Sequence, residues 1–167
     1  LRIAMNSNES PKPAASAQPR KTRSLPEYVK KINGVPLGAS GSLGNMINRS
    51  VGARSFYLFW KYWNPIWGYY LSRNVMKPLT RYFSTGIATL LTFAVSGAIH
   101  DFVVSLVLWR GVFFFTPWFV IMSLAVLASK KFHISYDGSP LPIRMSINLA
   151  WLLVCFLLAS AFEPLYA

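Results

Sequence analysis

The sequence is short of the residues that most often build metal and redox sites. Its 167 residues include one cysteine, two histidines and five acidic residues. A single cysteine, Cys155, cannot form a disulfide framework or a zinc cluster within this chain, and its place in an apolar run says nothing about the redox compartment. We therefore expect no metal and no resident cofactor.

Acidic residues are also few beside the 17 lysines and arginines, which gives a formal net charge of +12. Such a charge can indicate nucleic-acid binding, but the basic residues are not spread as a stripe. Thirteen of the 17 precede residue 84, and the rest lie in short connections, at Arg110, Lys130, Lys131 and Arg144. This is the positive-inside distribution of membrane proteins. We expect no nucleic-acid partner, a cytoplasmic N-terminus and a cytoplasmic loop at 130–145.

Apolar residues are abundant, with 53% of the chain hydrophobic and 16% aromatic. This composition predicts an integral membrane protein whose partner is the lipid bilayer. A hydrocarbon core about 30 Å thick needs roughly 20 apolar helical residues, and three runs approach that length. The expected fold is all-α, with about three transmembrane helices at 84–109, 112–129 and 145–163.

The composition divides the chain at about residue 50. Residues 1–50 are basic and rich in Ser, Ala, Pro and Gly, and predict a largely disordered or peripheral segment. Roughly the first 24 residues are expected to be disordered, 25–32 to form a short basic helix, and the Gly/Ser-rich stretch after it to be a loop. Residues 51–167 are expected to form the membrane domain.

An aromatic segment at 54–82 is expected to be an interfacial helix that precedes the first span. Its tryptophans and tyrosines favour the headgroup level, and Arg73 and Lys77 lie one helical turn apart, where they can reach phosphates of lipid headgroups or of a bound donor. Pro65 should divide the helix into two pieces. Asn64, just before it, either caps the second piece or turns its amide to a pocket.

The run STGIATLLTFAVSGAIHDFVVSLVLW at 84–109 carries two titratable residues, His100 and Asp101, near its middle. An ionised side chain at bilayer depth costs at least about 2.5–3.5 kcal/mol, so such residues are candidate functional residues. At 3.6 residues per turn, His100 shares one helix face with Thr89, Thr92 and Ser96. Gly97 flanks this polar stripe and would let another backbone or a substrate chain come close.

Two interpretations of His100 are open. The imidazole either acts as a general base in a cavity shielded from bulk water, or packs in the helix bundle with its nitrogens satisfied by Ser96 or a neighbouring helix. Asp101 lies about 100° further round the helix and is not expected to orient His100 directly. We expect it to pair with a lysine or arginine from another element, or to be protonated, and not to be catalytic.

A resemblance joins the aromatic segment to the histidine helix. The stretch FWKYWNPIWGYYLSRNVMKPL at 59–79, with SGAIHDF at 96–102, resembles the membrane-bound O-acyltransferase superfamily. It is most similar to the wax-synthase and sterol and diacylglycerol acyltransferase branches, which carry a similar F-W-x-x-W-N box and then a histidine followed by an acidic residue. The resemblance covers roughly residues 55–165, like the C-terminal half of these longer enzymes.

The resemblance implies a site and a reaction. His100 would be the general base and Asn64 the second signature residue, with Arg73, Lys77, Ser96 and Trp63 assigned to substrate binding. The reaction would transfer a fatty acyl group from a thioester donor, such as acyl-CoA, to a hydroxyl acceptor, such as a lipid or sterol alcohol, without a metal.

Other functions stay open beside this one. Because three spans cannot enclose a buried tunnel, the chain is incomplete, or completes its site with another subunit or a second copy, or is a descendant that no longer catalyses. The main alternative is a small structural or accessory subunit of a membrane complex, in which the polar residues of 84–109 make helix contacts. Ion conduction is less favoured, because only one helix carries central titratable groups.

Overall fold

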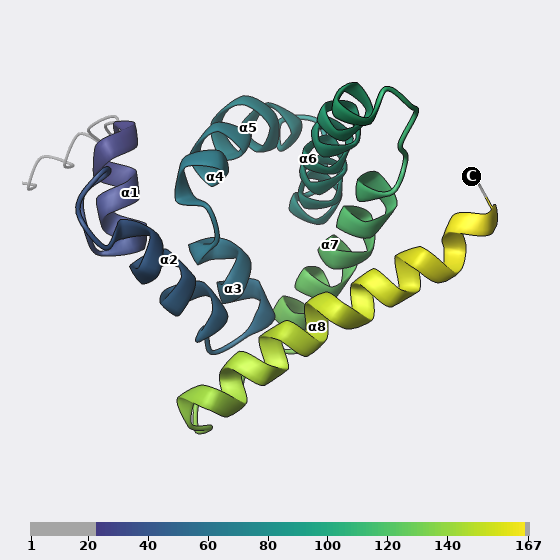
Figure 1. Ribbon diagram of the computed structural model, residues 1–167. Helices are drawn as coiled ribbons and strands as arrows, with labels where there is room; N and C mark the ends of the chain where they lie inside the picture. The colour runs from purple at the N-terminus through teal and green to yellow at the C-terminus, as the bar shows by residue number, and fades with distance from the viewer. Residues whose placement is uncertain (1–22, 166–167) are drawn as a thin grey trace, which may run out of the picture.

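The computed structural model describes residues 23–165, and this part of the chain is all-α, without a strand. Its α-helices are α1 (Leu25–Asn33), α2 (Ser42–Val51), α3 (Phe56–Tyr62), α4 (Pro65–Leu71), α5 (Lys77–Leu79), α6 (Thr85–Leu108), α7 (Phe115–Lys131) and α8 (Leu141–Phe162). A π-helix, η1 (Ser72–Met76), joins α4 to α5, and a 3₁₀ turn, η2 (Glu163–Leu165), follows α8. In Figure 1, α1 to α5 form one side of the molecule, α6 and α7 the other, and α8 runs beneath both.

Two short helices, α1 and α2, precede the aromatic segment. The backbone N–H of Ser24 donates to Glu27 at 3.1 Å at the start of α1, and Gly34 ends the helix at φ 85°. Glycine adopts this left-handed conformation without strain, which makes it a natural helix stop. The helix expected at 25–32 is confirmed, whereas α2 is an element that the composition did not predict. The disorder expected for roughly the first 24 residues falls almost entirely outside the described residues.

The aromatic segment is broken where Pro65 predicts. α3 ends at Tyr62, and Asn64 adopts a left-handed conformation with φ 40° and ψ 72° directly before Pro65. Asparagine enters this region more readily than most residues that carry a side chain. Its Oδ1 accepts a hydrogen bond from the Trp67 backbone N–H at 3.2 Å and so caps α4. The location of α3 and α4 at a membrane interface stays a prediction.

Two helices of the described chain, α6 with 24 residues and α8 with 22, are long and apolar enough to cross a membrane. At 1.5 Å per residue they measure about 36 and 33 Å, against a hydrocarbon core of about 30 Å. α7 occupies the span expected at 112–129, but its 17 residues give only about 25 Å, and its last turn holds Lys130 and Lys131. A third crossing therefore stays a prediction.

The burial pattern of α6 is the reverse of that of a helix in a soluble protein. Its buried residues are small or polar: Ala88, Thr92, Ser96, Gly97 and Asp101. Most of its exposed side chains are large and apolar, and Phe102 and Val107 are 63% and 72% exposed. Membrane helices pack through small and polar residues, whereas soluble monomers rarely expose apolar surface on this scale. The pattern favours a membrane protein.

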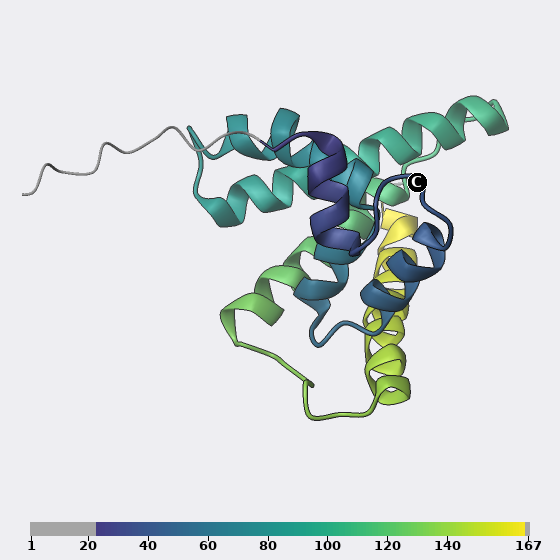
Figure 2. The ribbon, with the colours of Figure 1, turned by 90° about the vertical axis from the view of Figure 1, so that its left-hand side faces the viewer.

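α6 and α8 run in clearly different directions. Figure 1 views α6 nearly along its axis while α8 lies across the picture, and Figure 2, turned by 90°, shows α6 across the picture and α8 upright. Transmembrane helices tilt by about 0–40° from the bilayer normal. Two helices that cross steeply cannot both stand upright in one bilayer, so at least one is strongly tilted if both cross it.

The hydrophobic core lies where α3, α7 and α8 meet. Phe56 and Phe59 of α3 are 0% and 2% exposed, and Met122 of α7 is 1% exposed. The Phe56 ring stacks on Trp151 of α8 with 5.5 Å between ring centroids. This core fixes α3 against α7, and with it the end of α3 from which Asn64 follows.

A second anchor, Asn148 of α8, is fully buried and ties α8 to the turn between α2 and α3. Its Nδ2 donates to the carbonyl oxygens of Val51 at 2.8 Å and Ala53 at 2.9 Å, while its Oδ1 accepts from the Tyr136 hydroxyl. Burial raises the pKa of the Tyr136 hydroxyl from 10.0 to about 12, since the neutral form is favoured away from water. Beside this network, Arg54 and Asp137 form an exposed ion pair at 2.9 Å.

We expect Asn148→Leu to lower stability by about 2–3 kcal/mol. Leucine removes both donors and leaves the carbonyl oxygens of Val51 and Ala53 buried without partners, at roughly 1–3 kcal/mol each before relaxation. The measurement is the thermal unfolding midpoint of the purified protein in detergent. The matched control is Asn48→Leu at an exposed position of α2. Equal midpoints for the two variants would contradict the anchoring role of Asn148.

Candidate functional site

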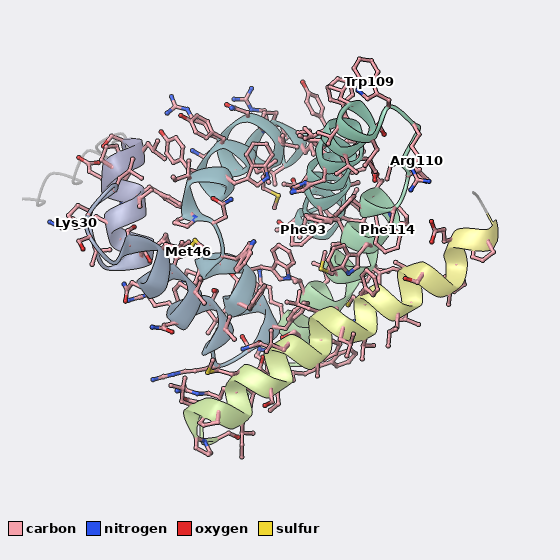
Figure 3. The ribbon with its side chains drawn as sticks, in the orientation of Figure 1. Lys30, Met46, Phe93, Trp109, Arg110 and Phe114 are labelled. Carbon is pink, nitrogen blue, oxygen red and sulfur yellow. The ribbon has the colours of Figure 1, made fainter. Side chains whose placement is uncertain are left out.

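A cavity of about 280 Å³ lies between α3, α4, η1, α6 and α7. Its lining combines aromatic rings with hydroxyl and amide groups: Trp60, Trp63, Asn64, Trp67, Gly68, Leu71, Ser72, Met76, Thr89, Thr92, Phe93, Ser96, His100 and Phe119. Phe93, labelled in Figure 3, extends from α6 toward Trp60 of α3, with 5.0 Å between ring centroids. An apolar pocket with a few convergent polar groups is the usual form of a small-molecule site.

The polar stripe of α6 forms one wall of this cavity. Thr89, Thr92, Ser96 and His100 all line it, as their spacing along the helix predicts. Thr92 donates its hydroxyl to the Ala88 carbonyl at 2.7 Å, and Ser96 accepts from the Trp67 indole Nε1 at 3.0 Å. The Trp67 contact joins α4 to α6 across the cavity.

The ring of His100 is held with a defined tautomer. Its Nδ1 lies 2.6 Å from the backbone carbonyl oxygen of Ser96, one turn earlier on α6. A carbonyl oxygen can only accept, so Nδ1 carries the proton of the neutral ring, and Nε2 is the nitrogen with the free lone pair. Nε2 accepts no hydrogen bond from the described residues. The geometry therefore contains one of the packing contacts expected of His100 and still leaves Nε2 able to accept a proton.

His100 stands where three hollows meet. The 280 Å³ cavity is called the main cavity from here on, because the whole polar stripe of α6 lines it. His100 also lines a more open hollow between α4 and α6, of about 410 Å³, together with Asn64, Trp67, Ile99, Val103 and Val104. A third hollow, of about 420 Å³, has His100, aromatic rings of α3 and α7, and apolar residues of α8 on its walls. A molecule at the imidazole can therefore extend in more than one direction along apolar surface.

Asn64 faces the same space as His100. Both residues line the main cavity and the hollow between α4 and α6, although 36 positions separate them in the sequence. Because the Asn64 Oδ1 is engaged by the Trp67 N–H, its Nδ2 keeps two donors without a partner among the described residues. The two expectations for Asn64, a helix cap and an amide at a pocket, are both met by one side chain.

The tryptophans of the aromatic segment are placed differently from one another. Trp63 is 39% exposed, stacks on Phe59 at 5.6 Å, and lines the main cavity. Trp60 and Trp67 also line the cavity, and the hydrogen bond of Trp67 goes to Ser96 on α6. Sequence patterning indicated headgroup contacts for all three, and the resemblance assigned only Trp63 to substrate binding. The places of Trp60 and Trp67 in the cavity wall were missed, since aromatic composition does not say which side of a helix is covered.

A π-helix forms the part of the wall next to α4. Pro78 has no N–H, so the regular bond to the carbonyl of Asn74 cannot form, and the chain widens so that the Lys77 N–H reaches Ser72 O. Such widened turns are frequent at functional sites. This one carries Ser72 and Met76 into the cavity lining, a feature that sequence analysis missed.

Arg73 and Lys77, assigned to substrate binding, are not part of the cavity wall. Both side chains are exposed, and Arg73 donates to the Tyr69 hydroxyl at 2.8 Å. They lie on the same stretch of chain as Ser72 and Met76, which do line the cavity. A contact with donor phosphates outside the cavity stays a prediction.

Asp101 has a different set of partners from those expected. Its Oδ1 accepts from the backbone N–H groups of Phe114 at 2.9 Å and Phe115 at 2.7 Å, and its Oδ2 accepts from the Thr116 N–H at 2.8 Å and hydroxyl at 2.6 Å. The side chain is 5% exposed. The expectation of a basic partner is wrong, because the carboxylate caps the start of α7, where unpaired N–H groups attract negative charge.

Gly97 provides the close approach that its place beside the polar stripe predicts. A Cβ built on it would lie 2.6 Å from Thr116 Cα and 2.7 Å from the Phe115 carbonyl oxygen. The backbone of α7 therefore lies directly against α6 one turn before Asp101. Together, Gly97 and Asp101 fix the start of α7 beside His100.

Comparison of the chain with protein-family models, with curated proteins and with solved structures finds no match in any of the three. Among the described residues, no group of three or more His, Cys, Asp or Glu side chains is placed to hold a metal ion.

Proposed function

We propose that the protein is a membrane O-acyltransferase-like enzyme that transfers a fatty acyl group from a thioester donor to a hydroxyl acceptor. The observation that carries the proposal is the shared cavity of His100 and Asn64, in which the lone pair of Nε2 and the donors of Nδ2 have no partner within residues 23–165. A proton acceptor and a carbonyl-binding donor at one apolar site are the two groups that acyl transfer requires.

His100 and Asn64 have different roles in the proposed reaction. His100 Nε2 takes the proton of the acceptor hydroxyl as its oxygen attacks the thioester carbonyl carbon. The Asn64 amide donates to the carbonyl oxygen, where negative charge develops. The C–O bond forms, the C–S bond breaks, and the leaving thiolate takes the proton from His100, so that an ester and a free thiol result. An apolar cavity limits competing hydrolysis by excluding water.

The surroundings of the cavity support acyl-CoA as the donor and a lipid or sterol alcohol as the acceptor. The apolar hollows around His100 suit fatty chains, and the exposed cations Arg73 and Lys77 suit the donor phosphates at the surface. In this arrangement the N-terminus and the 130–145 loop lie on the cytoplasmic side, as the distribution of basic residues predicts. A neighbouring subunit or a second copy would complete the enclosure of the cavity.

A second candidate is a non-catalytic accessory subunit of a membrane complex. The observation that favours it is the large exposed apolar surface of α6 and α8, which suits a protein partner as well as lipid. The two candidates differ in whether function requires a cavity that substrate can enter. An accessory role through the outer faces of α6 and α8 does not use the cavity.

Filling the cavity tests this difference. Gly68 lines the cavity, and a Cβ built on it meets nothing within 4 Å, so Gly68→Leu adds side-chain bulk at the cavity wall. We expect acyl transfer to fall by about tenfold or more, since crowding a packed site costs about 1–3 kcal/mol. The measurement is ester formation by the protein in lipid vesicles from labelled palmitoyl-CoA and a panel of long-chain alcohol, diacylglycerol and sterol acceptors.

The matched control is Gly86→Leu at the start of α6, where an added Cβ also meets open space but no cavity. This variant should transfer acyl groups at the wild-type rate. Absence of ester from every acceptor with the wild-type protein, or equal rates for the two leucine variants, would refute the proposed enzyme. Such a result, with stable association into a larger membrane complex, would favour the accessory subunit.

A further inference from the structure

We propose that Asp101 is a positioning residue for His100, which it serves through the first turn of α7 and not by direct contact. The inference rests on the proposed function, since it assigns a task within the same reaction. It departs from the expectation that the acidic residue beside the histidine forms an ion pair.

Asp101 satisfies the free amides at the start of α7. The N-cap, Phe114, has no side chain that can accept a hydrogen bond. Phe115 and Thr116 provide the first two helical N–H groups, the next residue, Pro117, has none, and Trp118 N–H bonds to Phe114 O at 3.2 Å. Both remaining amides, and that of Phe114, donate to Asp101. The carboxylate is therefore the only acceptor that the described chain offers them.

The first two turns of α7 also cover His100. Phe115 and Phe119, one turn apart on α7, have ring centroids 5.8 and 5.0 Å from the centroid of the imidazole. Their planes are tilted by 30° and 34° from the plane of the imidazole, so both rings are in packing contact with it. The hydrogen bond from Nδ1 to Ser96 O does not by itself stop rotation of the ring about the Cβ–Cγ bond. The two phenyl rings restrict that rotation.

The backbone of α6 connects these two sets of contacts. His100 and Asp101 are adjacent in α6. The same part of this helix therefore carries the imidazole and also binds the start of α7, whose Phe115 and Phe119 rings form the aromatic wall over His100. Gly97 allows the two helices to approach closely enough for Asp101 to reach three successive amides. Loss of the carboxylate would leave the Phe115 and Thr116 amides unpaired, and the turn would shift to find other acceptors. The imidazole would then lose its fixed direction.

The experiment compares Asp101→Ala, Asp101→Asn and wild type in vesicles, with two readouts. The first is acyl transfer, for which we expect kcat to fall on the order of 10- to 100-fold in Asp101→Ala with KM little changed, because a shift of about 1 Å in a reacting group has an effect of this size. Asp101→Asn keeps one carbonyl oxygen for the amides of Phe114 and Phe115 and should recover part of the rate.

The second readout does not depend on transfer. Diethyl pyrocarbonate modifies unprotonated imidazole nitrogens, and the chain has two histidines, of which His133 is exposed in the loop after α7. The ratio of modification rates, His100 to His133, measured by mass spectrometry on folded protein, should rise several-fold in Asp101→Ala and less in Asp101→Asn. His133 serves as the reference within the same molecule.

If Asp101 has only a structural role, its replacement should lower stability while the modification ratio and the transfer rate per folded molecule stay at wild-type values. That result would overturn the proposal. If Asp101→Ala does not fold, the comparison of Asp101→Asn with wild type decides in the same way. If wild-type protein transfers no acyl group, the proposed function fails, and an unchanged modification ratio is then needed to reject the positioning role as well.

Discussion

Replacement of His100 by glutamine is expected to reduce acyl transfer by about 10²- to 10⁴-fold, the range in which positioned general bases contribute. Glutamine is close to histidine in size, and its amide nitrogen falls nearest to the place of Nε2, so the substitution removes the proton acceptor while it keeps most of the side-chain volume. It has no nitrogen that accepts a proton near neutral pH. The loss should therefore fall on kcat, with a small change in KM.

The control for this change is His133→Gln, because His133 is the other histidine of the chain and lies exposed outside the cavity. Ester formation from labelled acyl-CoA, divided by the amount of folded protein, is measured for both variants. A wild-type rate in His133→Gln with a severe loss in His100→Gln supports proton transfer at Nε2. Undiminished transfer in His100→Gln would mean that another group removes the proton.

Features that depend on local sequence were predicted well. The apolar run that became α6 has the length of a span, and a break at Pro65 follows from the missing N–H of proline. The shared face of Thr92, Ser96 and His100 follows from helical periodicity alone. Each of these features is decided by residues within a few turns of one another, which is the range that a pattern in a single sequence covers.

Features that depend on distant contacts were not predicted. The sequence predicts a basic partner or a protonated side chain for Asp101, because a sequence shows charges but not the free amides at the start of a later helix. Asn148 bonds to carbonyl oxygens 97 and 95 residues away, and no local signal marks those acceptors. The inward turn of Trp67 is of the same kind, since its partner Ser96 lies 29 residues further along the chain.

The cavity depends both on local sequence and on contacts between distant residues. Helical spacing placed His100 on a polar face, but the opposite wall depends on the turn at Asn64 and on the π-helix, which bring α4 and η1 over that face. An asparagine before proline can be expected to cap a helix. Its second role, facing His100, follows only from how α3 packs on α7 and α8. His100 and Asn64 can therefore be singled out from the sequence, whereas their place in one cavity follows only from the fold.

Substitution of Gly97 by alanine is expected to lower stability by about 3 kcal/mol, at the upper end of the cost of overpacking a core. The added Cβ would lie 2.6 Å from Thr116 Cα, 2.7 Å from Phe115 O and 2.9 Å from Thr116 N. All three atoms belong to the backbone of α7, so no side chain can rotate to make room. The helix itself would have to move away from α6.

That movement is opposed by Asp101, which holds the same residues of α7 one turn further along α6. The strain of Gly97→Ala is therefore not relieved by a small shift, and it should also reduce acyl transfer by displacing Phe115 from His100. Gly86→Ala in the same helix is the matched control, because an added Cβ there meets nothing within 4 Å and alanine favours helix by up to about 1 kcal/mol.

The measurement is the thermal unfolding midpoint in detergent, with transfer per folded molecule as a second readout. A lowered midpoint for Gly97→Ala beside an unchanged or raised midpoint for Gly86→Ala is the expected result. Equal midpoints would show that α7 does not lie against α6 at this position. Since Asp101 reaches its three amides only if the helices are this close, that outcome would also remove the basis for the aromatic wall over His100.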